Sequence, residues 1–229
     1  MTRRFLAAEA VSVRLGGRPV LDRISLELAR GEVVGLTGPS GSGKTTLAQV
    51  LSGLRKPSGG RVVCDGSPLP RRHTGRIAML FQSPRRSCDP RLTLRQSIAE
   101  LARGPVAWES VLESVGMTPD LLDRYPAQVS DGQLQRAAVA RVLASEPDYL
   151  LCDEMTSMLD PATTASVART VTALAATGVG VLFISHDIPL LSVCADRLVR
   201  LGDNLSPVSG AATSSPGPTV DSTDDIGVL

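Results

Sequence analysis

Apolar positions near the start of the chain follow two patterns, and both predict β-structure. Between Leu21 and Leu28 an apolar residue occurs at every second or third position, which is typical of a strand with one buried face. A turn at residues 29–31 leads into Val33–Thr37, an apolar run typical of a strand buried on both faces. The chain is therefore expected to begin with β-rich structure.

Apolar runs of strand length recur further along the chain, with helical segments between them. The further strand candidates are Ile77–Phe81, Tyr149–Cys152 and Val179–Ile184, and the segments with helical spacing are Thr45–Leu54, Gln133–Ser145 and Ala162–Ala175. Buried strands that alternate with helices predict an α/β fold with a mainly parallel sheet.

The segment from Ser83 to Ala144 contains no run of the buried-strand type. Helical segments such as Leu94–Arg103 and Trp108–Val115 dominate it, so we expect an inserted helical lobe over about residues 84–145. From residue 204 onwards Ser, Pro, Gly, Thr and Asp prevail, which is typical of disorder. The expected organisation is one folded domain over residues 1–203 and a disordered tail over residues 204–229.

Composition and charge limit the function classes. The 229 residues are 42% hydrophobic and 21% charged, as in a soluble globular protein. The formal net charge of +1 argues against binding long nucleic acid by phosphate neutralisation. No apolar stretch reaches the roughly 18 residues of a membrane span, and Glu9 and Arg14 interrupt any signal-peptide core. A cytoplasmic protein with no nucleic-acid partner is expected.

The cysteines have neither a metal-binding nor a redox spacing. They are far apart in sequence and form no Cys-x-x-Cys pair: Cys64, Cys88, Cys152 and Cys194. We expect buried thiols in a reducing compartment.

A glycine-rich phosphate-binding motif follows Val33–Thr37. The residues Gly38, Pro39, Ser40, Gly41, Ser42, Gly43, Lys44 and Thr45 fit G-x-x-x-x-G-K-[ST]. The glycines let successive N–H groups point at phosphates, and the N-terminus of the following helix favours an anion. Lys44 is expected to reach the β- and γ-phosphates, and the Thr45 hydroxyl to bind Mg²⁺. The nucleotide-binding residues are predicted to continue to Thr46.

Two acids end the apolar run Tyr149–Cys152. Asp153 and Glu154 follow it directly, at the strand end where open α/β sheets bind their ligands. Asp153 is expected to hold Mg²⁺ through its water shell, and Glu154 to polarise the water that attacks the γ-phosphate.

These motifs and four others, in this order over residues Ala10 to about Arg200, resemble the ATP-binding cassette (ABC) family. Gln82 in Phe81–Pro84 resembles the Q-loop glutamine, and His186 in Ile184–Asp187 resembles the switch histidine. The D-loop is matched by the segment from Ser157 to Asp160. The signature, normally Leu-Ser-Gly-Gly-Gln, is matched by Val129–Gln133, whose expected contacts to a partner's ATP are Ser130, Asp131, Gly132 and Gln133.

The resemblance implies the fold and the chemistry. The fold would be an α/β P-loop NTPase with a mainly parallel core sheet, an N-terminal antiparallel β subdomain and the helical lobe. The ligands would be ATP and Mg²⁺, with Thr45, Gln82 and Asp153 around the metal. Catalysis would fall to Glu154, His186 and Gln82. The signature of one cassette completes the site of another in this family, so a second ABC ATPase subunit, identical or homologous, is implied, with dimer closure driven by nucleotide.

The chain departs from the family pattern at several positions. Leu15 stands where an aromatic residue commonly stacks on adenine, which would weaken base binding. Asp131 replaces a signature glycine and adds a negative charge near a partner's phosphate. Met155 and Met158 stand where the family often has Pro and Ala. Because Glu154 and His186 are intact, ATP hydrolysis is still expected.

One branch of the family is matched more specifically. Met79–Thr93 and Arg124–Gln128 resemble the importers of dipeptides, oligopeptides, nickel and metal chelates. This resemblance implies an ATPase subunit at the cytoplasmic face of the cell membrane, docked on two transmembrane permeases beside Gln82 and served by an extracytoplasmic solute-binding protein. Two alternatives stay open: an ABC ATPase of a soluble enzyme complex of the phosphonate-degradation type, or a regulatory nucleotide-binding subunit with slow turnover.

Overall fold

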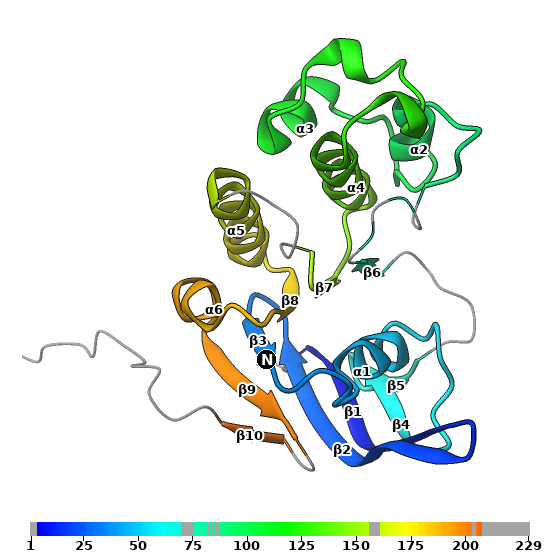
Figure 1. Ribbon diagram of the computed structural model, residues 1–229, viewed down its shortest axis with the longest axis vertical. Coiled ribbons are helices and arrows are strands. Elements are labelled where there is room, and N and C mark those ends of the chain that lie inside the picture. Colours follow the sequence, from blue (N-terminus) through cyan, green and yellow to red (C-terminus); the bar gives the residue numbers. More distant parts are fainter. Residues whose placement is uncertain are drawn as a thin grey trace, which may run out of the picture.

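Two β-sheets of different character carry the fold in the computed structural model (Figure 1). The structure describes residues 4–69, 76–81, 83, 85, 88–155, 161–202 and 205–207. The strands are β1 (Phe5–Leu15), β2 (Arg18–Ala29), β3 (Val33–Thr37), β4 (Gly59–Cys64), β5 (Ser67–Pro68), β6 (Ile77–Leu80), β7 (Tyr149–Asp153), β8 (Gly180–Ile184), β9 (Arg197–Leu201) and β10 (Leu205–Pro207). The helices are α1 (Lys44–Leu51), α2 (Leu94–Ala99), α3 (Trp108–Val115), α4 (Asp131–Ser145), α5 (Pro161–Ala176) and α6 (Ile188–Cys194), with short 3₁₀ turns at Pro119–Leu121 and Pro126–Gln128.

The N-terminal sheet is antiparallel, with strand order β2-β1-β4-β5. Its apolar side chains alternate along β1 and β2, and those on one face are buried against α1. The predicted alternation at Leu21–Leu28 belongs to this sheet.

The core sheet has the order β10-β9-β3-β8-β7-β6 and is parallel except at β10. Every residue of β3, β7 and β8 is buried. Successive side chains point to opposite faces, so Val34 and Leu36 join the cluster that contains α1, whereas Val33 joins the cluster that contains α5 and α6. Because other elements cover both faces of these strands, their residues are apolar throughout.

The helical lobe lies to one side of the core sheet and contains α2, α3 and α4 (Figure 1). Both α2 and α3 pack against α4. Capping boxes begin α2 at Thr93 and α4 at Ser130. The expected arrangement of a mainly parallel sheet, an N-terminal antiparallel sheet and a helical lobe is confirmed.

Several boundaries differ from the sequence predictions. The helix expected over Thr45–Leu54 ends at Leu51, because Gly53 adopts a left-handed φ of 73°. The helix expected over Leu94–Arg103 ends at Ala99, and Leu101 beyond it is 50% exposed, so no core contact extends the helix. Leu205–Pro207, expected in a disordered tail, instead pairs with β9, whose edge supplies backbone partners. Residues 208–229 of that tail lie outside the described residues.

Two further expectations concern thiols and membranes. All four cysteines are free; Cys64, Cys152 and Cys194 are buried as predicted, whereas Cys88 is partly exposed. Within the described ranges, no helix has both the length and the apolarity that crossing a membrane requires.

Candidate nucleotide and catalytic site

The phosphate-binding motif forms the loop between β3 and α1. Gly43 is the N-cap of α1 with a φ of 97°, and Gly38 has a φ of 150°. A Cβ at position 38 would lie 2.2 Å from the Leu201 carbonyl oxygen, and one at position 43 would lie 2.7 Å from Leu21 Cδ2. These two glycines therefore let the loop pack directly against β9 and β2.

Lys44 lies beneath this loop. Its side chain is only 5% exposed, and its Nζ donates to the carbonyl oxygens of Gly38 and Pro39 at 3.0 Å each. The same Nζ is 3.9 Å from Glu154 Oε1. The buried ammonium is thus held at the first turn of α1, where the helix N-terminus also favours an anion.

A hollow of about 430 Å³ opens beside the loop. Residues from the loop, from the first two strands and from two core-strand ends line it: Leu15, Val20, Ser40, Gly41, Gly43, Lys44, Thr45, Thr46, Glu154 and His186. The Ser42 hydroxyl is buried and has no hydrogen-bond partner among the described residues. This hydroxyl lies 3.2 Å from where a Cβ of residue 38 would stand and does not line the hollow.

The expected Mg²⁺ ligands Thr45 and Asp153 lie together. Thr45 Oγ1 donates to Asp153 Oδ1 at 3.1 Å. Burial raises the pKa of Asp153, while the Thr45 hydrogen bond and the charge of Lys44 oppose that rise. A hydroxyl and a carboxylate at this point are ligands that Mg²⁺ accepts.

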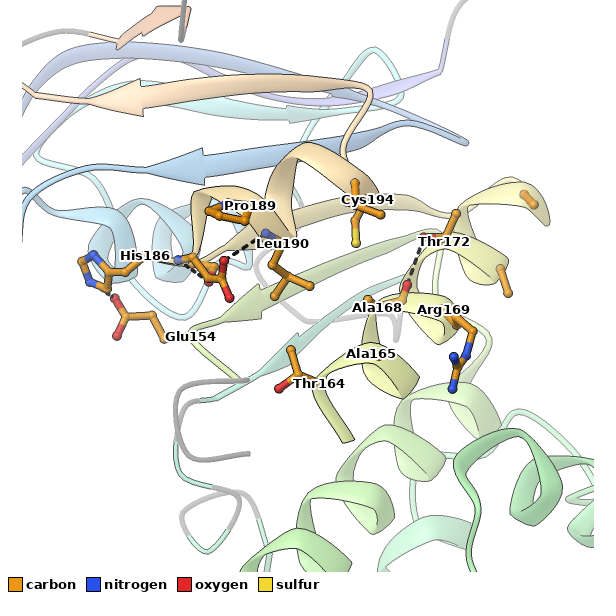
Figure 2. Close-up of a pocket in the computed structure, with 15 residues that line it drawn as sticks. Glu154, Thr164, Ala165, Ala168, Arg169, Thr172, His186, Pro189, Leu190 and Cys194 are labelled. Carbon is orange, nitrogen blue, oxygen red and sulfur yellow. Dashed lines mark hydrogen bonds and ion pairs between the residues drawn. The ribbon is translucent and has the colours of Figure 1, made fainter. Parts of the chain in front are cut away.

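Glu154 and His186 follow adjacent parallel strands. Asp153 of β7 is in register with Ile184 of β8, and the Glu154 N–H donates to the Ile184 carbonyl at 3.1 Å. The side chains of Glu154 and His186 point toward each other (Figure 2), and Glu154 Oε1 is 2.8 Å from His186 Nε2. Glu154 has a left-handed φ of 49°, an uncommon conformation for this residue type. An imidazole and a carboxylate so paired can hold an attacking water and accept its proton.

The signature residues lie at the start of α4, away from the hollow. Ser130 is the N-cap: the Gln133 N–H donates to Ser130 Oγ at 3.2 Å, and the Ser130 N–H donates to Gln133 Oε1 at 3.0 Å. Ser130, Asp131, Gly132 and Gln133 do not line the hollow within this chain. This separation agrees with an expected role toward another molecule.

Three predicted residues lie outside the described residues: Gln82, Ser157 and Asp160. Two residues around the site were not predicted from sequence. Val20 lines the hollow across the hairpin from Leu15, and Arg85 forms an ion pair with Asp131 at 2.8 Å. The positions of Val20 and Arg85 depend on tertiary contacts, which leave no local pattern in the sequence.

A groove of about 1130 Å³ continues from Glu154 and His186 between α5 and α6 (Figure 2). Ala168 and Arg169 of α5 line one wall, and Leu190 of α6 lines the other. Glu154 and His186 thus lie at one end of a partly apolar groove.

A family model described as ABC transporter matches residues 21–157. A Brucella ovis protein named as a peptide import ATP-binding protein is 37% identical over 199 residues, which are 80% of this chain and 63% of that protein. A methionine import ATP-binding protein of Caulobacter vibrioides is 37% identical over 202 residues, which are 81% of this chain and 60% of that protein. The chain therefore spans less than two thirds of these curated relatives.

One solved structure is similar to this chain over nearly the whole length of both proteins. It is an ATP-binding cassette in a dimeric, post-hydrolysis state with ADP and Pi. Its TM-score is 0.77 at 26% identity, with 90% of this chain and 99% of that chain covered.

Proposed function

The chain belongs to the ABC transporter family, and from this premise we propose that it binds and hydrolyses ATP as the motor subunit of an importer. One observation carries the proposal. A single hollow beside the phosphate loop is lined by Lys44, Thr45, Glu154 and His186. Asp153 lies behind Thr45, whose hydroxyl donates to it. A cation, a metal-binding pair and a proton acceptor are the groups that phosphoryl transfer to water requires.

Each side chain has a stated task in this proposal. Lys44 and the N–H groups of the loop bind the phosphates, and Thr45 with Asp153 holds Mg²⁺; Gln82 is the third proposed ligand. Bound Mg²⁺ supplies charge neutralisation of the phosphates. Glu154 accepts the proton of the attacking water, and His186 orients the Glu154 carboxylate through their 2.8 Å contact.

A second cassette completes the proposed site. The signature at the start of α4 would face the ATP of the other cassette, and Ser157 to Asp160 would line the same interface. ATP between the two cassettes closes the dimer, and hydrolysis lets it reopen. The likeness to a cassette solved as a dimer with ADP and Pi supports this arrangement.

The proposed permease contact is a second groove of about 380 Å³ between β6 and the helical lobe. Apolar residues such as Met79 and Phe81 line it, and Leu54 and Leu101 at its edge are 57% and 50% exposed. Exposed apolar surface of this kind is typical of a protein interface. We propose that one transmembrane permease docks in this groove and that a second permease docks on the other cassette, which would place the chain on the cytoplasmic face of the membrane.

Peptides are the proposed solute, delivered by an extracytoplasmic binding protein. The relatives named for peptide import and for methionine import support an amino-acid-derived cargo. Nickel and metal chelates are the other solutes of the branch that Met79–Thr93 resembles. Identifying the permeases and the binding protein decides between these cargoes.

The catalytic assignment is tested by comparing ATP turnover of the assembled protein with that of its Glu154→Gln variant. Because a general base contributes about 100-fold or more, turnover should fall by at least that factor while ATP binding persists. Glu113→Gln on an exposed position of α3 is the matched control and should leave turnover unchanged. Full turnover in the Glu154→Gln protein would overturn the assignment.

The importer assignment is tested by tagging the chain in its native cell and identifying what copurifies after gentle membrane solubilisation. Two permeases and a second cassette are expected. Recovery of soluble enzymes alone, with no membrane fraction, would replace the importer with the cytoplasmic enzyme complex. Closure on ATP without appreciable turnover would identify a regulatory subunit.

A further inference from the structure

Asp131 creates an electrostatic problem for the two-cassette arrangement. It is the first residue of α4 and is 69% exposed, next to the N-cap Ser130. A partner's γ-phosphate approaching this helix end would meet a carboxylate of the same sign. The positive end of the helix, which should attract the phosphate, is thereby partly offset.

Arg85 contacts this carboxylate directly. Its Nε donates to Asp131 Oδ1 at 2.8 Å, and its Nη2 is also 2.8 Å from that oxygen. A third nitrogen, Nη1, donates to the Pro126 carbonyl at 3.3 Å. The guanidinium is therefore held by a backbone carbonyl as well as by the acid, which fixes its charge at the start of α4.

The contact also joins two parts of the chain with different proposed roles. Arg85 follows β6 and the position of Gln82, whereas Pro126 and Asp131 flank the signature N-cap. An arginine is suited to this because its planar fork can bind a carboxylate and a carbonyl at once.

We propose that Arg85 is a positioning residue that neutralises Asp131, so that the start of α4 can accept the γ-phosphate of a second cassette. The inference rests on the proposed function, since it concerns the signature toward a partner's ATP. In this chain the Arg85–Asp131 pair, whose charges cancel, stands at the position where the family signature has an uncharged glycine. Its consequence is conditional: Arg85 is needed only while Asp131 is present.

The test measures ATP turnover of the complex that copurifies with the tagged chain, in Arg85→Gln, Asp131→Gly and the double variant. Arg85→Gln should lower kcat/KM for ATP by about tenfold, because the Asp131 charge is then uncompensated. The double variant should match Asp131→Gly in kcat/KM, because without the Asp131 carboxylate Arg85 has no charge to neutralise. Arg85→Lys, which retains the charge, should restore most of the loss.

Controls separate charge from folding. Arg95→Gln removes another exposed arginine–aspartate pair of the helical lobe, to Asp123 at 3.1 Å, and should leave kcat/KM unchanged. The Arg85→Gln defect should also shrink in high salt, because salt screens the repulsion between the exposed Asp131 carboxylate and the phosphate.

An equal loss from Arg85→Gln with and without Asp131 would overturn the proposal, as would failure of lysine to rescue. A parent complex that turns over ATP no faster than its Glu154→Gln version would instead overturn the proposed hydrolysis itself. The two failures are therefore distinguishable.

Discussion

Replacing Gly38 by alanine should destabilise the nucleotide-free protein much more than replacing Gly41. Both glycines belong to the phosphate loop and both have positive φ, 150° and 78°. Their surroundings differ: a Cβ at position 38 would lie 2.2 Å from the Leu201 carbonyl oxygen, whereas a Cβ at position 41 would have nothing within 4 Å.

The expected loss in free energy of unfolding has two contributions, one from the positive φ and one from the contact with Leu201. Alanine at positive φ costs about 1–2 kcal/mol, and this applies to both substitutions. At position 38 the overlap with Leu201 adds about 1–3 kcal/mol, because Leu201 is fully buried and cannot withdraw. The free energy of unfolding should therefore fall by about 2–5 kcal/mol for Gly38→Ala and about 1–2 kcal/mol for Gly41→Ala.

Urea unfolding followed by far-ultraviolet circular dichroism, without nucleotide, measures both values. Equal dependence on urea concentration across the variants shows that the same surface unfolds in each. Equal destabilisation by the two alanines would refute the reasoning, since it would mean that contact with Leu201 does not restrain the loop. Loss of ATP binding alone in Gly38→Ala, with stability unchanged, would refute it as well.

Three further outcomes are expected. Leu15→Tyr should tighten ATP binding by about 1–3 kcal/mol through stacking on the base, and unchanged affinity in calorimetry would place the base elsewhere. Asp153→Asn should reduce Mg²⁺-dependent hydrolysis at least about 10-fold, while ATP affinity measured in EDTA stays the same; a drop in both would indicate a folding defect instead. Burial opposes ionisation of Asp65, but hydrogen bonds from the Tyr149 hydroxyl and two arginines prevail and lower its pKa. The stability that Asp65 contributes is thus present above its unfolded pKa of about 3.9 and is lost as pH falls through its lower folded pKa. The difference in free energy of unfolding between the parent protein and Asp65→Asn should therefore shrink only in acid.

Elements with a strong local pattern were predictable from the sequence. The bounds of β3 and α3 match the predicted Val33–Thr37 and Trp108–Val115. In β3 both faces are buried, and in α3 the apolar positions Leu112 and Val115 face the lobe core. Where burial alone dictates residue type, the pattern is sufficient.

Elements that depend on neighbours were not predictable. β9 contains two arginines among five residues, because Arg197 and Arg200 lie on its less buried positions. α6 spans seven residues and begins with a cap by Asp187 and a proline at Pro189. Such short elements are stabilised by packing on the sheet more than by their own sequence.

The site shows the same division. Lys44 and Asp153 could be proposed from the sequence because each lies within a contiguous motif. Arg85 could not, because its partner Asp131 is 46 residues away and only the fold brings them together. Charge compensation across a fold leaves no periodicity for a sequence pattern to detect.

The contact between Glu154 and His186 depends on strand register more than on any side chain alone. Cys152 pairs with Phe183 and Asp153 with Ile184, so Glu154 and His186 leave the sheet side by side at one edge. A shift by one residue would exchange Val181 and Phe183 of one buried cluster with Leu182 and Ile184 of the other, so the packing of both clusters holds the register. The residues that bury the sheet therefore also set the 2.8 Å contact between Glu154 and His186. Substitutions in β8 far from the hollow should accordingly impair hydrolysis wherever they change the packing of that strand.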